Sequence, residues 1–192
     1  IGHLVDTLLD DRIGHGPIRY SLSIRDHSVD DYLNQQKQIA TEHAAVIDPL
    51  DIEEYEAGGG FAALRKCLAE QTPEVVLTEI ENAGLRGRGG GGYPTYLKWH
   101  AVRKAPSGQK YVICNGDEGD PGAFMDRMLM ESYPYRVLEG MAIAAWTVGA
   151  DQGVLYIRSE YPLALTRITE AIKVCKDRDY LGENILGEHF SF

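Results

Sequence analysis

The feature that most constrains this chain is a pair of short apolar segments with a long apolar helical pattern between them. Residues 110–115 and 153–158 have the length and composition of buried strands. The helical pattern begins at Pro134 and stops at Gly149. Strands that alternate with helices predict an α/β fold with a parallel sheet flanked by helices. Ligands of such sheets bind beyond the carboxyl ends of the strands.

Four further helices are predicted from apolar spacing and from prolines that can begin a helix. The predicted ranges are Phe61–Glu70, Pro73 to about Ala83, Pro94 through at least Trp99, and Pro162 to about Asp177. The glycine-rich stretch between Ala83 and Pro94 therefore follows a helix and precedes another one.

The first 46 residues are predicted to form an extension, because they contain few strong apolar periods, and this extension is expected to be mostly helical. Ile1–Arg12 fits one amphipathic turn, and Arg25–Val46 fits an exposed or loosely packed helix that ends at Asp48 and Pro49. The chain of 192 residues, 44% of them hydrophobic, can bury one core of ordinary size. We therefore predict an extension over 1–46 and one α/β domain over 47–192.

Charge and composition argue against several classes of protein. The formal net charge of −10 does not fit a nucleic-acid-binding domain. No run of about 20 apolar residues is present, so direct membrane insertion is not expected. Cys67, Cys114 and Cys175 are too few and too far apart for a disulfide framework, a zinc site or an iron–sulfur cluster. We expect reduced thiols in a cytoplasmic protein and no metal ligated within these residues.

The stretch GLRGRGGGGYPT, at 84–95, is the most unusual local sequence. It lies within a segment, 82–116, that carries six lysines and arginines and no acidic residue. A dinucleotide fingerprint needs a strand immediately before the glycines, and a Walker A loop needs Gly-Lys-Ser/Thr, so neither motif fits well. A flexible linker remains an alternative, although Arg86 and Arg88 between the glycines give the loop a charge that a linker does not need.

A phosphate cradle explains this loop better. Glycines let backbone N–H groups approach an anion closely, and the helix that begins at Pro94 directs its positive end to the same place. Lys98, one turn into that helix, can close on a phosphate. Arg103, further along, is expected to face solvent.

A second polar motif, CNGDEGDPG at 114–122, follows the first predicted strand directly. Asn115 offers a donor and an acceptor, as the pyrimidine edge of a flavin or an amide requires. Asp117 and Glu118 can accept hydrogen bonds from ribityl or ribose hydroxyls. The alternative interpretation is an acidic turn that binds nothing.

The two motifs together resemble one family, the NADH-oxidising flavoprotein subunit of respiratory complex I. The family includes relatives in NAD-linked hydrogenases, NAD-dependent formate dehydrogenases and electron-bifurcating complexes. The stretches that carry the resemblance are GLRGRGGGGYPTYLKW (84–99), CNGDEGDPGAFMDRMLME (114–131), YRVLEGMAIAA (135–145) and YIRSEYP (156–162). The likeness runs from about Ile47 to Phe192. The stretch GDEGDPGAFMDR is nearer to the hydrogenase, formate dehydrogenase and bifurcating branches than to complex I.

The resemblance implies an FMN-binding α/β domain in which NADH stacks on the flavin and passes a hydride to it. The residues that it assigns to FMN phosphate and ribityl binding are Gly87, Arg88, Gly89, Gly90 and Lys98. Asn115 and Asp117 would contact the flavin. Glu118, the one catalytic candidate, would lie beside the nicotinamide and its ribose. Tyr93 stands where the family has Phe, an aromatic side chain against the bound dinucleotide.

The same resemblance implies an NADH dehydrogenase (diaphorase) subunit that passes electrons from FMN to iron–sulfur clusters of partner subunits in a larger complex. The family continues with a further flavin and NADH segment, a ubiquitin-like domain and a helical domain that binds a [4Fe–4S] cluster. None of these follows Phe192, so the resemblance implies a part of a longer subunit with an incomplete FMN site. The alternatives are a non-catalytic assembly subunit and a nucleotide-binding regulatory domain, which the presence of bound flavin would distinguish.

Overall fold

The computed structural model describes residues 31–32, 35–42, 46–106 and 108–192. The chain divides into two units, Ile1–Ile39 and Ala40–Phe192, and the fold below is that of the second. The element predicted for Ile1–Arg12 lies outside the described residues. The helix predicted over Arg25–Val46 is wrong for residues 35–42, which form turns and bends. Those residues are mostly polar, and Ile39 is 72% exposed, so they offer no apolar stripe that a helix could bury.

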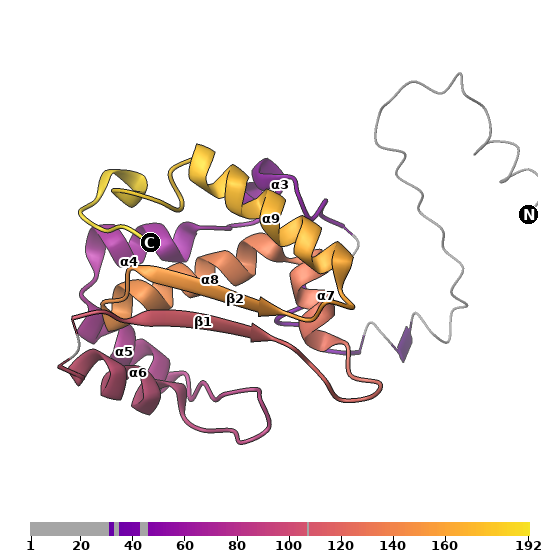
Figure 1. Cartoon of the computed structure of the whole chain (residues 1–192), viewed down its shortest axis with the longest axis horizontal. Coiled ribbons are helices and arrows are strands. Elements are labelled where there is room, and N and C mark those ends of the chain that lie inside the picture. Colours follow the sequence, from indigo (N-terminus) through magenta and orange to yellow (C-terminus); the bar gives the residue numbers. More distant parts are fainter. Residues whose placement is uncertain (1–30, 33–34, 43–45, 107) are drawn as a thin grey trace, which may run out of the picture. The chain divides into compact units, whose positions relative to one another are not determined.

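The described part of the second unit is built from helices around two strands (Figure 1). The elements are α3 (Ile52–Ala57), α4 (Ala62–Glu70), α5 (Pro73–Asn82), α6 (Thr95–Lys104), β1 (Tyr111–Gly116), α7 (Met125–Ser132), α8 (Pro134–Val148), β2 (Gln152–Ile157), α9 (Pro162–Asp177) and a 3₁₀ turn (Ile185–Gly187). The helices and strands predicted between residues 61 and 177 are confirmed to within about two residues at each predicted end. The sequence reasoning missed α7.

Local sequence explains most of these boundaries. The helices α5, α8 and α9 each begin with a proline at the first helical position, where its missing N–H costs nothing. The hydroxyl of Thr72 accepts the N–H of Val75 and caps α5. Gly149 ends α8 with a φ of 75°, a left-handed conformation that favours glycine.

The two strands pair in parallel, from Tyr111 opposite Gln152 to Gly116 opposite Ile157. The crossover between them contains α7 and α8, and α8 lies behind the sheet in the view of Figure 1. The predicted parallel α/β fold is therefore confirmed. Because both strands run in the same direction, the turns after β1 and β2 lie at the same edge of the sheet.

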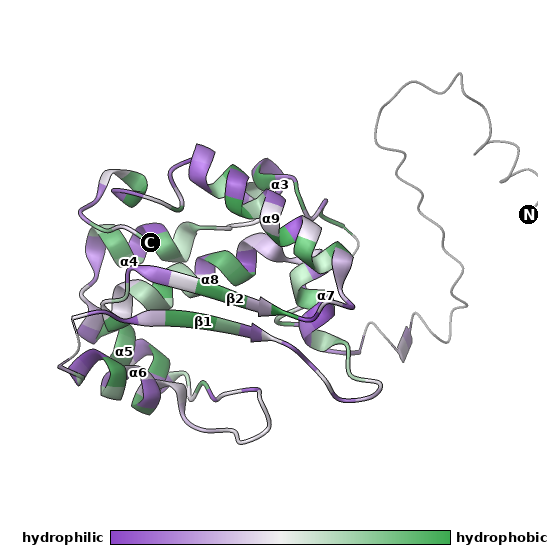
Figure 2. Cartoon of the chain, viewed as in Figure 1, coloured by the Kyte–Doolittle hydropathy of each residue, from purple (hydrophilic) through white to green (hydrophobic). Residues whose placement is uncertain are grey.

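The hydrophobic core is centred on α8, which buries residues on most of its turns. Leu138 and Ala145 of α8 pack with Leu64 of α4 and Cys175 of α9 in one cluster. Partly buried residues of the strands, including Leu155, pack against this cluster. The middle of each strand is hydrophobic, as Figure 2 shows.

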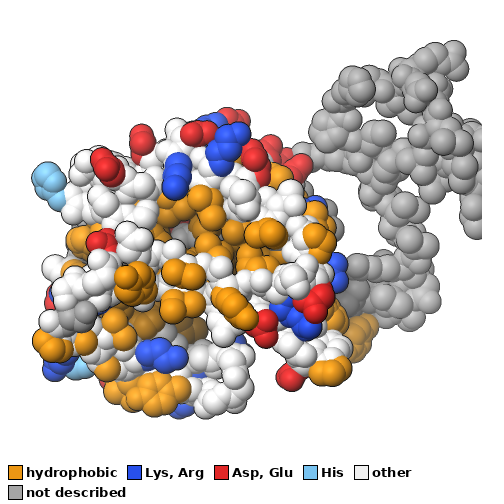
Figure 3. All heavy atoms as spheres, in the orientation of Figure 1, with side chains coloured by type: hydrophobic (Ala, Val, Ile, Leu, Met, Phe, Trp, Pro, Cys, Tyr) orange, Lys and Arg blue, Asp and Glu red, His pale blue; other side chains and the backbone are white. Residues whose placement is uncertain are grey.

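The opposite face of the sheet is open in the described part of the chain. Tyr111 and Ile113 of β1 are 56% and 64% exposed, and Val154 and Tyr156 of β2 are 44% and 58% exposed. Figure 3 shows hydrophobic side chains gathered over this face. The prediction of fully buried strands is therefore wrong for one face, because the described helices cover only the other.

Candidate functional site

The glycine loop, residues 84–94, connects α5 to α6 and projects from the body of the domain (Figure 1). The backbone N–H of Gly87 donates to the carbonyl of Tyr93 at 2.9 Å. The Arg86 guanidinium donates to the carbonyl of Gly92, also at 2.9 Å. Arg86 therefore closes the loop on itself, and its side chain is engaged within the loop.

Gly89 and Gly91 are loop glycines that the described chain does not explain, and Gly87, where an added Cβ would make only ordinary contacts with Tyr93, is another. Gly90 and Gly92 have φ values of 102° and 57°, a region that side chains disfavour. Gly89 and Gly91 lie outside that region, and a Cβ added to either would meet no atom within 4 Å. Neither backbone conformation nor packing in the described chain therefore requires glycine at these two positions. Glycine at such positions leaves the backbone accessible to close approach by a ligand.

Two cationic side chains, one in this loop and one in the helix after it, have no partner among the described residues. Arg88 and Lys98 are exposed, and in the described part of the chain neither side chain forms a hydrogen bond or an ion pair. The helix α6 begins at Thr95 without a side-chain cap, so the positive end of its dipole is not neutralised by a carboxylate or hydroxyl. The loop therefore combines accessible backbone, two available cations and a helix N-terminus. Tyr93, 54% exposed, adds an accessible aromatic ring.

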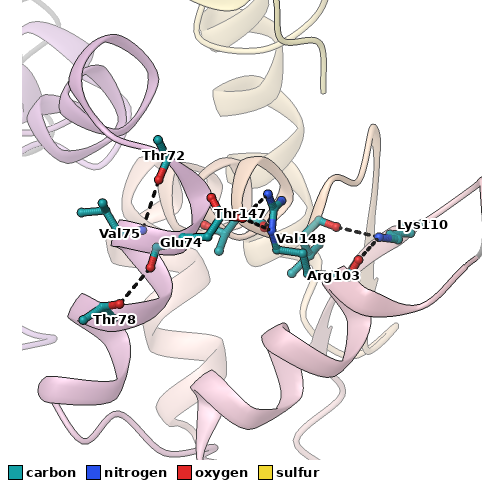
Figure 4. Close-up of polar contacts among 8 residues, drawn as sticks. All are labelled: Thr72, Glu74, Val75, Thr78, Arg103, Lys110, Thr147 and Val148. Atoms are coloured by element: carbon teal, nitrogen blue, oxygen red, sulfur yellow. Dashed lines mark hydrogen bonds and ion pairs between the residues drawn. The ribbon is translucent and has the colours of Figure 1, made fainter.

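Arg103 does not face solvent, and the expectation that it would is wrong. Its guanidinium pairs with Glu74 of α5 at 2.6 Å and donates to the carbonyl of Thr147 at 3.1 Å (Figure 4). The ammonium of Lys110 donates to the carbonyls of Arg103 and Val148, at 2.8 and 3.1 Å. The last carbonyls of α8 have no partner within their own helix, and these two cations satisfy them. Arg103 therefore links α6 to α5 and α8, and Lys110 links the start of β1 to the ends of α6 and α8.

The turn after β1 contains the other predicted site residues. The Asn115 side chain accepts the N–H of Asp117 at 3.1 Å, which leaves its amide NH₂ to donate elsewhere. The Glu118 carboxylate accepts the backbone N–H groups of Asp126 and Arg127, at 2.9 and 3.0 Å. Glu118 therefore caps the N-terminus of α7. Burial and, after it, the Glu118 charge raise the pKa of the Asp126 carboxyl.

The turn after β2 contacts Glu118 from the other side. Arg158 and Tyr161 both donate to the carbonyl oxygen of Glu118, at 3.2 and 3.3 Å. The sequence motif YIRSEYP contains both residues, but sequence reasoning did not assign them to the site. Their position directly after the second predicted strand was the available signal, since ligands bind beyond such ends.

The structure thus joins the turn after β1 to α7 and to the turn after β2. Within the described residues, no hydrogen bond or ion pair joins this assembly to the glycine loop. In Figure 3 the outline of the molecule is notched between the region of the glycine loop and the turn after β1.

Metal ligation and membrane insertion find no support in the described part of the chain. No group of three or more His, Cys, Asp or Glu residues there is arranged to hold a metal ion. None of the helices in that part is both long and apolar enough to cross a bilayer.

The fold and site define a parallel α/β domain with an exposed glycine loop and a polar turn after its first strand. A protein-family model described as the Nuo51 FMN-binding domain matches residues 80–186, and the chain belongs to this family.

Curated relatives come from respiratory and hydrogenase enzymes. An NADH-quinone oxidoreductase subunit of Rhizobium meliloti is 48% identical over 138 residues, which are 72% of this chain and 33% of the relative. NADP-reducing hydrogenase subunit HndC of Solidesulfovibrio fructosivorans is 46% identical over 158 residues, 82% of this chain and 32% of the relative. The chain therefore spans about a third of the length of these relatives.

A solved structure supports the same relationship. The H₂-reduced NAD⁺-reducing [NiFe]-hydrogenase contains a chain that matches with a TM-score of 0.57 and 31% sequence identity. The match covers 76% of this chain and 24% of the hydrogenase chain. Fold, family and sequence motif therefore agree.

Proposed function

We propose that this chain is the FMN-binding part of an NADH-oxidising flavoprotein subunit. In this proposal the subunit takes a hydride from NADH onto FMN and passes electrons to iron–sulfur clusters of a larger redox complex. The observation that carries the proposal is the glycine loop, where Gly89 and Gly91 have no explanation in the protein. Arg88 and Lys98, which have no partner in the part of the chain that the structure describes, supply the charge that a phosphate requires.

The residues present fit FMN. Gly87 to Gly90, with Arg88 and Lys98, form the phosphate and ribityl side of the site. Bound FMN supplies the hydride- and electron-accepting chemistry, and the protein binds, orients and shields it. No protein nucleophile is needed for such a reaction.

The turn after β1 provides the flavin and nicotinamide side of the proposed site. The Asn115 amide retains its donors, and the Asp117 carboxylate has no hydrogen bond in the described chain, so both can contact a flavin. In this proposal Glu118 lies beside the nicotinamide and its ribose. The exposed ring of Tyr93 is available to stack against the dinucleotide.

Several observations support a multisubunit complex in the cytoplasm. The relatives carry the names of subunits of NADH-quinone oxidoreductase and of NADP-reducing hydrogenase, and another is the alpha subunit of the NAD-reducing hydrogenase HoxS of Cupriavidus necator. Cys67, Cys114 and Cys175 are free thiols, as a reducing compartment favours. Electrons from the flavin would leave through a cluster outside residues 1–192.

Flavin content of matched lysine variants tests the proposal. Lys98 and Lys104 are exposed residues of the same helix, and neither side chain has a partner in the described chain. Lys98→Ala in the full-length protein should weaken FMN binding by about 10- to 150-fold, which corresponds to one charge-assisted hydrogen bond. Lys104→Ala should keep wild-type flavin content. Equal flavin content in the two variants, or wild-type protein without flavin, would contradict the proposal.

A further inference from the structure

The backbone of Glu118 has an unusual conformation that its neighbours enforce. Its φ is 42°, in the left-handed region, which non-glycine residues rarely occupy. Such a conformation is strained and persists only where surrounding contacts fix it. The carboxylate is fixed by two N–H groups of α7, at 2.9 and 3.0 Å.

The carbonyl of Glu118 is fixed independently, from the turn after β2. Arg158 donates to it through Nη1 at 3.2 Å, and Tyr161 donates to it through its hydroxyl at 3.3 Å. Forty or more positions separate these donors from Glu118 in the sequence. Glu118 is therefore held by two parts of the fold at once, α7 and the turn after β2.

Arg158 and Tyr161 are themselves held in place. Arg158 forms an ion pair with Glu160 at 3.0 Å, so its guanidinium plane is fixed while Nη1 remains directed at Glu118. Tyr161 is 8% exposed, and the guanidinium groups of Arg127 and Arg158 lie 5.4 and 5.7 Å from its ring centroid. Both donors are consequently pre-organised, and little side-chain freedom is lost in holding the turn.

From this geometry we propose that Arg158 and Tyr161 are positioning residues for the NADH side of the site, an inference that rests on the proposed function. They act through the Glu118 carbonyl, which they fix so that the Asn115–Glu118 turn has one conformation. A displacement of this turn misplaces the groups that orient the dinucleotide, because binding geometry must hold within a fraction of an ångström. The FMN phosphate cradle is a separate loop and is not affected.

The removal of one hydroxyl tests this proposal in the full-length protein. Tyr161→Phe keeps the buried ring over which the two arginines lie, and it deletes the hydroxyl with its hydrogen bond to Glu118 and its interaction with the Arg158 side chain. We expect the KM for NADH to rise about two- to tenfold, the value of one hydrogen bond, with unchanged FMN content. Tyr135→Phe is the matched control, since its buried hydroxyl also donates to a backbone carbonyl, that of Leu50, at 2.8 Å. The control should keep the wild-type KM.

The double variant Tyr161→Phe/Glu118→Gln shows whether Tyr161 acts through Glu118. If it does, the combined change in KM is smaller than the product of the two single changes, because coupled residues are not additive. Multiplicative effects would overturn the proposal, as would a Tyr161→Phe variant with wild-type KM. Wild-type protein that binds no FMN and oxidises no NADH would instead contradict the proposed function itself.

Discussion

The carboxylate of Glu139, in the middle of α8, accepts a hydrogen bond of 2.9 Å from the backbone N–H of Phe61. It also accepts the N–H of Leu64 at 3.2 Å and the hydroxyl of Tyr55 at 2.6 Å. Phe61 has a φ of 58° and provides no side-chain cap for α4. A buried carboxylate of another helix therefore caps α4. Burial and the hydrogen bond from Tyr55 to Glu139 raise the pKa of the Tyr55 hydroxyl.

Glu139→Ala should lower the free energy of unfolding by about 3 kcal/mol, because it leaves buried donors without an acceptor. The effect should be measured as faster hydrogen exchange of the α4 amides and a lower melting temperature. Glu170→Ala, an exposed glutamate of α9 in a weak ion pair with Lys173, is the control and should change stability by less than about 0.5 kcal/mol. Similar exchange rates in both variants would exclude the capping role.

Arg103→Ala should destabilise the attachment of α6 by about 1 to 2 kcal/mol, because the carbonyl of Thr147 and the Glu74 carboxylate both lose their donor. Lys104→Ala removes a neighbouring positive charge that has no partner in the described chain and should have little effect. The measurement is hydrogen exchange of α6 and of the end of α8. If Arg103→Ala behaves as Lys104→Ala does, the contacts in Figure 4 contribute no stability.

Glu118→Gln should change NADH kinetics while the protein retains its FMN. The substitution removes a charge on the proposed nucleotide side and can preserve only one of the two bonds to α7, since the amide nitrogen is not an acceptor. We expect kcat/KM for NADH to fall about 5- to 150-fold, the range of 1 to 3 kcal/mol. Steady-state kinetics and flavin absorbance are the measurements. A variant that loses FMN but keeps its affinity for NADH would show that Glu118 contacts the flavin and not the nucleotide.

The helices that begin at a proline and the two strands could be predicted from the sequence because their signals are local. The caps that Glu139 and Glu118 provide could not, since each carboxylate reaches a helix from outside it, and the capped residue nearest in sequence is 75 positions from Glu139 and 8 positions from Glu118. The expected solvent exposure of Arg103 is wrong for the same reason, because its partners lie on two other helices. The glycine loop and the turn after β1 are recognisable by composition, whereas the contribution of Arg158 depends on the sheet register.

Cys175 provides a prediction about pH. Its thiol is fully buried in the main core, and burial, followed by the charge of Glu139, raises its pKa from 9.0 to about 12. Because the folded pKa lies above the unfolded value, the folded state is favoured fully below pH 9, and this contribution is lost as the pH rises from 9 towards 12. Alkaline conditions should therefore weaken the packing of α9.

The first readout is iodoacetamide modification of Cys175, followed by peptide mass spectrometry. At pH 9 the thiolate fraction should be several hundredfold smaller than in the denatured chain, so modification should be correspondingly slow. Hydrogen exchange of α9 should accelerate as the pH rises from 9 towards 12, beyond its intrinsic pH dependence. Cys175→Ala should reduce that excess without abolishing it, because the pKa values of Tyr135 and Tyr180 are also raised, each to about 12. Modification of Cys175 at the rate of the denatured chain would show that the thiol is not shielded by the core.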